Sequence, residues 1–307
     1  MKKLTEKLFL VFALVCFLLG CKGPTQVGEG AVQGTPNENN GKELTVTMFN
    51  VGKADAMLVQ VDGKNVVIDT GLYNDAKTLI QKLRSKNVKT IDHLFMTHPH
   101  ADHIGGVLPI LNTISVKTLY ETGIKNPKSK LQPLITQKAK EKHVEVKRVN
   151  APGTINITPE VKLEILSPTS QEVSGNNVDP NINSLVMRMV FKDFSMMFTA
   201  DSYKETEYKI MKNYSPKDLR ADILKVAHHT SNSSTSYEWL QAVRPKVAIA
   251  SYANKPGVEF GKYPNKKTLN RILDQKIKFY GTEDKGDITI ITDGKVYEVK
   301  TEKGDSK

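Results

Sequence analysis

Four side chains that commonly bind metal ions lie within six residues of one another, in the segment Thr-His-Pro-His-Ala-Asp-His-Ile-Gly-Gly that begins at residue 97. The segment follows a short apolar strand expected at 91–96. In an extended loop, residues two apart point the same way, so His98 and His100 can share one metal ion. Asp102 and His103 open the next helix and can reach a second ion. We therefore predict a centre for zinc or a similar divalent ion at a strand end.

Strand-like and helix-like segments alternate from residue 43 to residue 302, which we take as one folded domain. Strands outnumber helices, and hairpins mix with crossovers, so we expect two mixed sheets flanked by helices. Strands are expected at 44–50, 56–61, 65–69, 91–96, 116–120, 143–149, 161–166, 185–191, 194–199, 222–227, 246–250, 277–280, 288–292 and 296–300. Helices are expected at 74–84, 103–111, 131–141, 204–212, 236–243 and 266–275, with Asn74 as a possible cap of the first.

The first twenty residues have the pattern of a secretory signal peptide, with a basic start and an apolar run at Leu8–Leu19 that is short for a membrane span. The run ends in Leu-Leu-Gly-Cys, which resembles the bacterial lipobox and implies that Cys21 is lipidated. An uncleaved signal anchor is the alternative. Residues 21–42 are rich in Gly, Pro, Thr and Asn and are expected to be a flexible tether, while 303–307 form a polar tail.

The composition narrows the class of protein. Hydrophobic residues make up 39% and charged residues 25%, which fits a soluble globular protein and is too apolar for a disordered one. Only the N-terminal segment is apolar enough to enter a bilayer, which excludes a channel or transporter with several spans. Two cysteines are too few for a disulfide-stapled fold or a cysteine-based zinc finger. The formal net charge of +11 favours an anionic substrate, and no protein partner is predicted.

The histidine segment resembles the signature of the metallo-β-lactamase superfamily. Five further segments resemble, in the same order, motifs of the soluble hydrolase domain of ComEC-type competence proteins. They are Phe-Asn-Val-Gly-Lys-Ala-Asp-Ala from residue 49, Val-Ile-Asp-Thr-Gly from 67, Asn-x-Asn-Ser-Leu-Val from 181, Phe-Thr-Ala-Asp from 198 and Leu-Lys-Val-Ala-His-His from 224. The resemblance runs from about Leu44 to Tyr297. It implies the αβ/βα sandwich of this superfamily, with two divalent ions held by loops at one edge of the sheets.

The resemblance also implies how the metal ligands are shared. His98 and His100 would bind one ion, and Asp102 and His103 the other. Asp201 matches a carboxylate that bridges the two ions, although an aspartate that caps the following helix is the alternative reading. One histidine of the pair at 228 and 229 would complete the set. We slightly favour His228 as the ligand and expect His229 to orient or contact the substrate.

Other residues are expected to support the site or to contact substrate. Asp69 matches an aspartate that supports the histidine loop, and Asp55 either has a similar role or pairs with a nearby lysine. Asn183 and Ser184 stand where antibiotic-hydrolysing relatives carry a histidine, which disfavours β-lactamase activity. Ser231 opens a hydroxyl-rich loop that suits phosphate, or that merely caps a helix.

This chain departs from the family pattern at three positions. Ala54 and Thr230 replace glycines. Tyr263 stands where ComEC-type domains commonly carry a histidine, and its hydroxyl can still donate a hydrogen bond. We expect Asp102, His229 and Tyr263 to be the catalytic side chains. Because Tyr263 departs from the family pattern, it is the position at which we expect the reaction rate or the substrate to differ from the family.

These features together predict a dinuclear metal-dependent hydrolase, with a phosphodiester of DNA or a related polyanion as the first candidate substrate. Zinc is the first expectation for the metal and manganese the alternative. The predicted location is the outer face of a bacterial cytoplasmic membrane, to which the lipid on Cys21 anchors the chain. The alternatives are hydrolysis of another exterior ester (a phosphorylcholine ester, a lactone or, least of all, a β-lactam) and a non-catalytic metal-binding lipoprotein.

Overall fold

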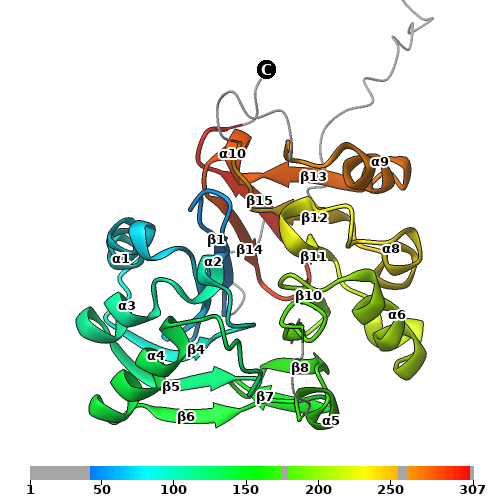
Figure 1. Ribbon diagram of the computed structural model, residues 1–307. Helices are drawn as coiled ribbons and strands as arrows, with labels where there is room; N and C mark the ends of the chain where they lie inside the picture. Colours follow the sequence, from blue (N-terminus) through cyan, green and yellow to red (C-terminus); the bar gives the residue numbers. More distant parts are fainter. Residues whose placement is uncertain (1–41, 175–178, 255–261, 305–307) are drawn as a thin grey trace, which may run out of the picture. The chain divides into compact units, whose positions relative to one another are not determined.

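Two β-sheets pack face to face, and helices cover the outer face of each sheet (Figure 1). The computed structural model describes residues 42–174, 179–254 and 262–304. The predicted signal peptide, Cys21 and nearly all of the predicted tether lie outside these ranges, as do residues 305–307. No helix among the described residues is long and apolar enough to cross a membrane.

The first sheet has eight strands in the order β15-β14-β1-β2-β3-β4-β5-β6. Neighbours from β15 to β3 are antiparallel, whereas β3, β4, β5 and β6 run parallel, so the sheet is mixed as predicted. The strands are β1 (Leu44–Met48), β2 (Ala56–Val61), β3 (Lys64–Thr70), β4 (Thr90–Phe95), β5 (Ser115–Glu121), β6 (Glu145–Arg148), β14 (Ile288–Thr292) and β15 (Tyr297–Thr301).

The second sheet has seven strands in the order β13-β12-β11-β10-β9-β8-β7. Here β10 to β13 run parallel and β7 to β10 are antiparallel, so this sheet is also mixed. Its strands are β7 (Gly153–Asn156), β8 (Val161–Ser167), β9 (Val186–Phe191), β10 (Phe194–Phe198), β11 (Ile223–Lys225), β12 (Val247–Ala250) and β13 (Lys278–Gly281).

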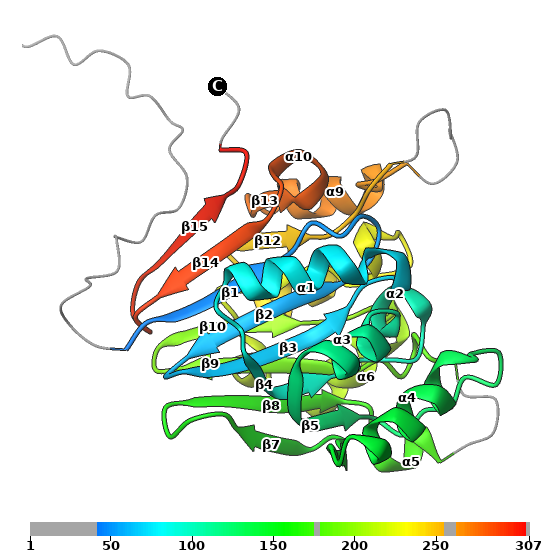
Figure 2. The same ribbon diagram turned by 90° about the vertical axis from the view of Figure 1, so that its left-hand side faces the viewer.

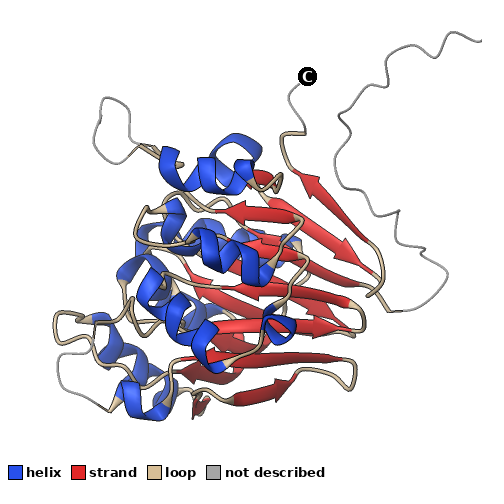
Figure 3. Ribbon diagram, turned by 90° about the vertical axis from the view of Figure 1, so that its right-hand side faces the viewer, coloured by secondary structure: helices blue, strands red, loops and turns tan. Residues whose placement is uncertain are grey.

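Three helices cover each outer face, and short helical turns lie in the connections (Figures 1 and 3). On the first sheet lie α1 (Ala76–Ser85), α3 (Val107–Thr113) and α4 (Leu131–Glu141). On the second sheet lie α6 (Lys204–Asn213), α8 (Tyr237–Val243) and α9 (Lys266–Asp274). The short elements are η1 (Tyr73–Asp75), α2 (Ala101–Ile104), α5 (Ser170–Val173), α7 (Pro216–Leu219), η2 (Ala227–Thr230) and α10 (Thr282–Lys285).

The alternation of apolar residues explains why each element packs where it does. Leu44, Val46 and Met48 lie on one face of β1, and all three are buried in the core between the two sheets. In α1 the residues spaced at three and four positions, Leu79, Ile80 and Leu83, face the first sheet, as the helical period predicts. The sequence therefore determines both the layer and the face of these elements.

One predicted helix is interrupted in the structure. We expected a single helix at 103–111, but α2 ends at Ile104 and α3 begins at Val107. Both intervening glycines lie against backbone: a Cβ on Gly105 would lie 2.4 Å from the Tyr73 nitrogen, and one on Gly106 would lie 2.4 Å from the Thr70 oxygen. Only glycine fits this close approach, which lets the turn between α2 and α3 lie against η1 and the end of β3. The residue at the N-cap of α1 is Asp75, and the predicted cap Asn74 lies within η1.

Candidate metal centre

The predicted site residues come from loops that follow parallel strands. His98 and His100 follow β4, Asp201 follows β10, and the histidine pair at 228 and 229 follows β11. Parallel strands deliver the loops at their carboxyl ends to the same edge of a sheet, where ligand sites form. In Figure 2, α2 marks this edge beyond the ends of β3 and β4.

Four residues of these loops converge on one point. Asp102, His103, Asp201 and His229 each present a ligand atom, and these atoms lie within 4.8 Å of one another. His103 Nε2 lies 3.3 Å from Asp201 Oδ2. His229 Nε2 lies 3.6 Å from Asp201 Oδ1 and 3.5 Å from Asp102 Oδ2. The geometry thus groups His229 with the aspartates, whereas the sequence analysis had slightly favoured His228 for this position.

The buried polar atoms of this cluster fit a metal ion. His103 Nε2, His229 Nε2 and Asp201 Oδ1 are buried and have no hydrogen-bond partner among the described residues. Leaving such atoms unsatisfied costs free energy, so a native protein normally pairs them. Two imidazole nitrogens and carboxylate oxygens that point at a common position form a ligand set typical of zinc and similar divalent ions.

A second group of imidazoles lies next to the first cluster. His98 Nε2 lies 3.0 Å from His100 Nδ1, and the rings of His98 and His103 have their centroids 4.0 Å apart. His228 Nε2 lies 3.7 Å from Asp201 Oδ2, and its ring is partly exposed. Asp201 therefore contacts His103, His229 and His228, and it is the residue to which the sequence resemblance assigned a bridging role.

Asp69 ties the histidine loop to β3. Its Oδ2 lies 2.7 Å from His103 Nδ1, and the Thr97 hydroxyl donates to the same oxygen at 2.7 Å. The Thr97 backbone N–H donates to Asp69 Oδ1 at 2.9 Å. With its Nδ1 held in this way, His103 presents Nε2 to the cluster. This contact pattern matches the supporting role that the sequence resemblance implied for Asp69.

A buried ion pair lies behind the cluster, and the sequence analysis identified only half of it. The Lys225 ammonium contacts the Asp55 carboxylate, and both side chains are fully buried. The Ser251 hydroxyl donates to Asp55 Oδ1 at 2.7 Å, and His229 Nδ1 lies 3.0 Å from the Ser251 carbonyl oxygen. Asp55 thus pairs with a lysine, and its carboxylate also lies beside His103 and His229. The lysine inside the apolar run Ile-Leu-Lys-Val-Ala was the available signal for Lys225.

The electrostatics of the cluster keep the aspartates ionised. Burial alone would raise the pKa of Asp201, but the nearby imidazoles of His103 and His229 hold it well below its usual value. Burial would lower the pKa of His103, yet Asp201 and Asp69 outweigh it and raise that pKa well above the usual value. At His98 burial dominates, and the pKa is lowered. The centre therefore offers a cation an ionised carboxylate between imidazoles.

The backbone around the histidine pair is strained. His228, His229 and Thr230 have φ values of 50°, 50° and 71°, in the left-handed region that glycine prefers. Such residues cost about 1–3 kcal/mol each and are found mainly at functional sites. The turn directs His229 into the cluster and leaves His228 partly exposed at the outer edge of the centre, which we call its mouth. There the His228 Nδ1 lies 3.3 Å from the Ser233 hydroxyl.

The three residues predicted to contact substrate, Asn183, Ser184 and Ser231, do not lie together in the structure. Asn183 and Ser184 are buried and bond within their own turn, to the backbone oxygens of Asp179 and Pro180. The Ser231 hydroxyl lies 2.9 Å from that of Ser233, which joins it to His228 through hydrogen bonds. Of the three, Ser231 is the one that the structure connects to the mouth of the centre.

Tyr263 is held next to the mouth by an asparagine and a lysine. The Tyr263 backbone N–H donates to Asn254 Oδ1 at 2.7 Å, and Asn254 Nδ2 donates to the Tyr263 carbonyl at 2.6 Å. The Lys53 ammonium lies 4.6 Å from the centre of the Tyr263 ring. The Tyr263 ring thus lies beside a positively charged side chain. No distance among the described residues places its hydroxyl within the four-residue cluster.

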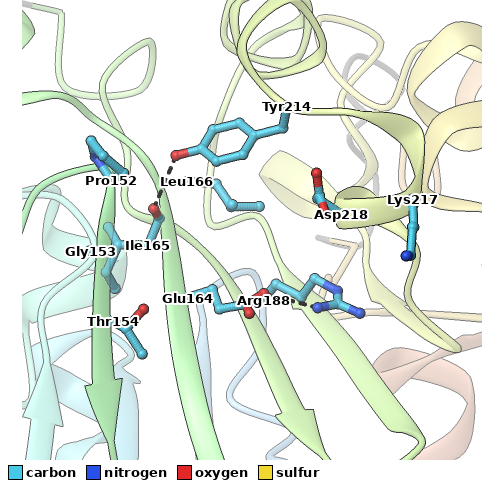
Figure 4. Close-up of a pocket in the computed structure, with 10 residues that line it drawn as sticks. All are labelled: Pro152, Gly153, Thr154, Glu164, Ile165, Leu166, Arg188, Tyr214, Lys217 and Asp218. Carbon is cyan, nitrogen blue, oxygen red and sulfur yellow. Dashed lines mark hydrogen bonds and ion pairs between the residues drawn. The ribbon is translucent and has the colours of Figure 1, made fainter.

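A surface pocket of about 590 Å³ lies away from this centre, beside β7 and β8 (Figure 4). Its polar groups bond to one another: Arg188 pairs with Glu164 at 2.9 Å, and the Tyr214 hydroxyl donates to the Ile165 carbonyl at 3.4 Å. None of the predicted site residues lines it. We therefore assign the chemistry to the metal centre and not to this pocket.

The sequence matches a known family over most of the described domain. The metallo-beta-lactamase superfamily matches residues 50–253, and the chain belongs to this superfamily. ComE operon protein 3 of Bacillus subtilis (strain 168) is 30% identical over 266 residues, which cover 80% of this chain and 33% of that protein. Competence protein ComA of Neisseria gonorrhoeae is 28% identical over 260 residues, covering 84% and 33%. The chain thus spans about a third of the length of these curated relatives.

A solved structure supports the fold independently. A CmlA beta-hydroxylase mutant matches with a TM-score of 0.52 at 13% identity, over 83% of this chain and 54% of that one. At this identity the likeness concerns the fold alone. The fold, the family and the cluster of histidine and aspartate residues define a metal-dependent hydrolase of the metallo-beta-lactamase superfamily that resembles competence proteins.

Proposed function

We propose that the chain hydrolyses phosphodiesters with the help of two divalent metal ions and that DNA or a related polyanion is its substrate. The position of Asp201 carries this proposal, because its carboxylate oxygens lie 3.3 Å from His103 Nε2, 3.6 Å from His229 Nε2 and 3.7 Å from His228 Nε2. A carboxylate so placed can serve both ions of a dinuclear centre. The competence proteins among its relatives and the net charge of +11 support a polyanionic substrate.

The ligands would divide between the two ions as the sequence resemblance implies, except at the histidine pair. His98 and His100 would hold one ion, and Asp102, His103 and His229 would hold the other, with Asp201 shared. The partly exposed His228 lies 3.7 Å from Asp201 Oδ2. Zinc suits this donor set best, and manganese is the alternative because of the carboxylate oxygens. Such ions, when bound, lower the pKa of water and polarise a phosphoryl oxygen.

The chain's own residues position the reaction. Asp69 and the Ser251 carbonyl fix the Nδ1 atoms of His103 and His229, so that both rings present Nε2 inward. Asp102 is the partly exposed carboxylate of the cluster, and we expect the substrate to approach from its exposed side. Ser231 and Ser233 supply hydroxyl donors next to His228 that can bind a non-bridging phosphate oxygen.

We also propose that the protein acts outside the cytoplasm on a lipid anchor. The basic start, the apolar run at Leu8–Leu19 and the cysteine after Gly20 support this proposal. A tether of about twenty residues would hold the domain roughly 25 Å from the membrane surface on average. A substrate that reaches the cell from outside would meet the enzyme there.

A substrate panel tests the proposed activity. Purified full-length protein loaded with zinc or manganese is assayed on DNA, bis(p-nitrophenyl) phosphate, a lactone, a β-lactam and a phosphorylcholine ester. We expect cleavage of DNA and of bis(p-nitrophenyl) phosphate, and we expect Asp102→Ala to abolish it while the circular dichroism spectrum stays unchanged. Turnover confined to the lactone or the lactam would refute the phosphodiesterase proposal, and turnover confined to the phosphorylcholine ester would refute DNA as the substrate.

A further inference from the structure

Lys53 is an exposed cation at the mouth of the metal centre. It lies two residues before Asp55, and its ammonium stacks over the ring of Tyr263. No carboxylate within the described ranges pairs with it. The backbone N–H of Asp55, two residues after Lys53, donates to the Asp102 carbonyl oxygen at 3.1 Å, which holds the segment that carries Lys53 beside the centre. The charge of Lys53 is therefore available to an incoming anion.

The start of α9 lies beside the same mouth. The Asn265 backbone N–H donates to the Thr230 hydroxyl at 2.9 Å, and the Thr268 hydroxyl donates to the Ser231 carbonyl at 3.1 Å. These two bonds hold the first turn of α9 against the loop that follows His229. The same turn carries exposed lysines at 266 and 267.

Four exposed lysines thus lie on two segments beside the mouth, the segment before Asp55 and the start of α9, and we call Lys53, Lys262, Lys266 and Lys267 the lysine strip. None of the four has an ion-pair partner in the part of the chain that the structure describes. Tyr263, which supports Lys53, is itself fixed by two bonds to Asn254. The strip is therefore a group of unpaired positive charges on a backbone that is held in place.

We propose that the lysine strip binds the phosphates that flank the scissile phosphate of a DNA strand. This inference rests on the proposed phosphodiesterase function and extends it from the reacting group to the rest of the substrate. A small phosphodiester carries one negative charge and can use at most one or two of these lysines. Four unpaired cations on two neighbouring segments match a polymer with one charge per nucleotide, as in basic grooves that follow a single strand.

The test compares two variants that remove the same charge. Lys53→Gln/Lys267→Gln removes two cations from the strip. Arg84→Gln/Lys89→Gln removes two exposed cations near the start of β4, whereas the histidine loop follows the opposite end of that strand. Binding of a fluorescein-labelled phosphorothioate oligonucleotide, which resists cleavage, is measured by fluorescence anisotropy as a function of salt concentration. Bis(p-nitrophenyl) phosphate hydrolysis is measured on the same preparations.

We expect the strip variant to bind the oligonucleotide more weakly, by roughly 5-fold for each lost contact near 0.1 M salt, and the slope of log K against log salt to fall by about 0.7 per contact. The control variant should bind like the parent, and Lys53→Arg/Lys267→Arg should restore binding. Hydrolysis of the small phosphodiester, which can use at most one or two of these lysines, should fall less in the strip variant than oligonucleotide binding does, and it should stay at the parent's rate in the control variant.

The possible failures are distinguishable. If the strip variant and the control variant bind DNA equally well while the parent cleaves phosphodiesters, the strip inference is wrong and the proposed function stands. If no variant cleaves any phosphodiester but the strip variant alone loses DNA binding, the proposed reaction fails and the strip remains a DNA-binding surface.

Discussion

The ammonium group of Lys225 contacts the carboxylate of Asp55 in the interior of the protein, and neither side chain is exposed to solvent. Burial would raise the pKa of Asp55, but the charge of Lys225 outweighs it and lowers that pKa. The paired carboxylate lies 3.9 Å from His103 Nδ1 and 3.6 Å from His229 Nδ1. One internal ion pair thus stands behind both histidines that face the candidate metal centre.

Lys225→Met should lower the free energy of unfolding by about 3–5 kcal/mol, because it leaves a buried carboxylate without its counter-charge. Urea unfolding followed by tryptophan fluorescence measures the change. Lys162→Met, which breaks the exposed pair with Glu164, is the matched control and should cost under about 1 kcal/mol. Equal effects of the two substitutions would show that the Lys225–Asp55 pair has no special role in stability.

His229→Ala should reduce bound metal more than His228→Ala does. His229 belongs to the four-residue cluster, whereas His228 is partly exposed and lies 3.7 Å from the shared carboxylate. Elemental analysis of the purified proteins gives the metal content. A greater loss in His228→Ala would instead support the ligand choice favoured by sequence alone.

Asp69→Asn should weaken metal binding by roughly 10–100-fold, since Asp69 fixes the ring of His103 through Nδ1. Competition with a chromophoric chelator measures the dissociation constant. Asp92→Asn serves as the control. It removes an aspartate of β4 that pairs with Lys117 and Lys64. The supporting role of Asp69 would be refuted if both variants kept the parent's affinity.

Much of the fold could be predicted from the sequence because the apolar periods are clear. The helix at 131–141 and the strand at 288–292 coincide with α4 and β14, and the hairpin at 185–199 differs by a residue at each outer end. The four methionines of that hairpin are buried, as expected of core residues. Strand β7 was missed because Gly-Thr-Ile-Asn has a single large apolar residue and lies at a sheet edge.

The site was predictable as a set of residue types but not as a geometry. The order of the motifs identified His98 to His103, Asp201 and the histidine pair, because metal-binding residue types can be read from the sequence alone. Which histidine of the pair faces inward depends on three consecutive left-handed residues, and no residue in that stretch is a glycine that would signal the turn. The partner of Asp55 is 170 residues away in the chain, at Lys225, and only the packing of β11 beside the centre brings the two together.

Cys21→Ala should release the protein into the medium or leave an unprocessed precursor, because the cysteine is the proposed lipid attachment site. Membrane fractionation and the electrophoretic mobility of the protein measure the outcome. Cys16→Ala is the control, since that cysteine lies inside the apolar run of the proposed signal peptide. Identical fractionation and processing of Cys21→Ala and the parent would rule out the anchor.

The most direct test of the account is whether DNA cleavage follows metal content in the intact protein. The full-length chain is stripped with a chelator and then titrated with zinc or manganese, while bound metal and DNA cleavage are measured on the same samples. We predict that cleavage is lost on stripping and returns as about two ions per chain are restored, and that Asp201→Ala recovers neither. Cleavage that persists in the metal-free protein, or no cleavage at full metal occupancy, would contradict the account.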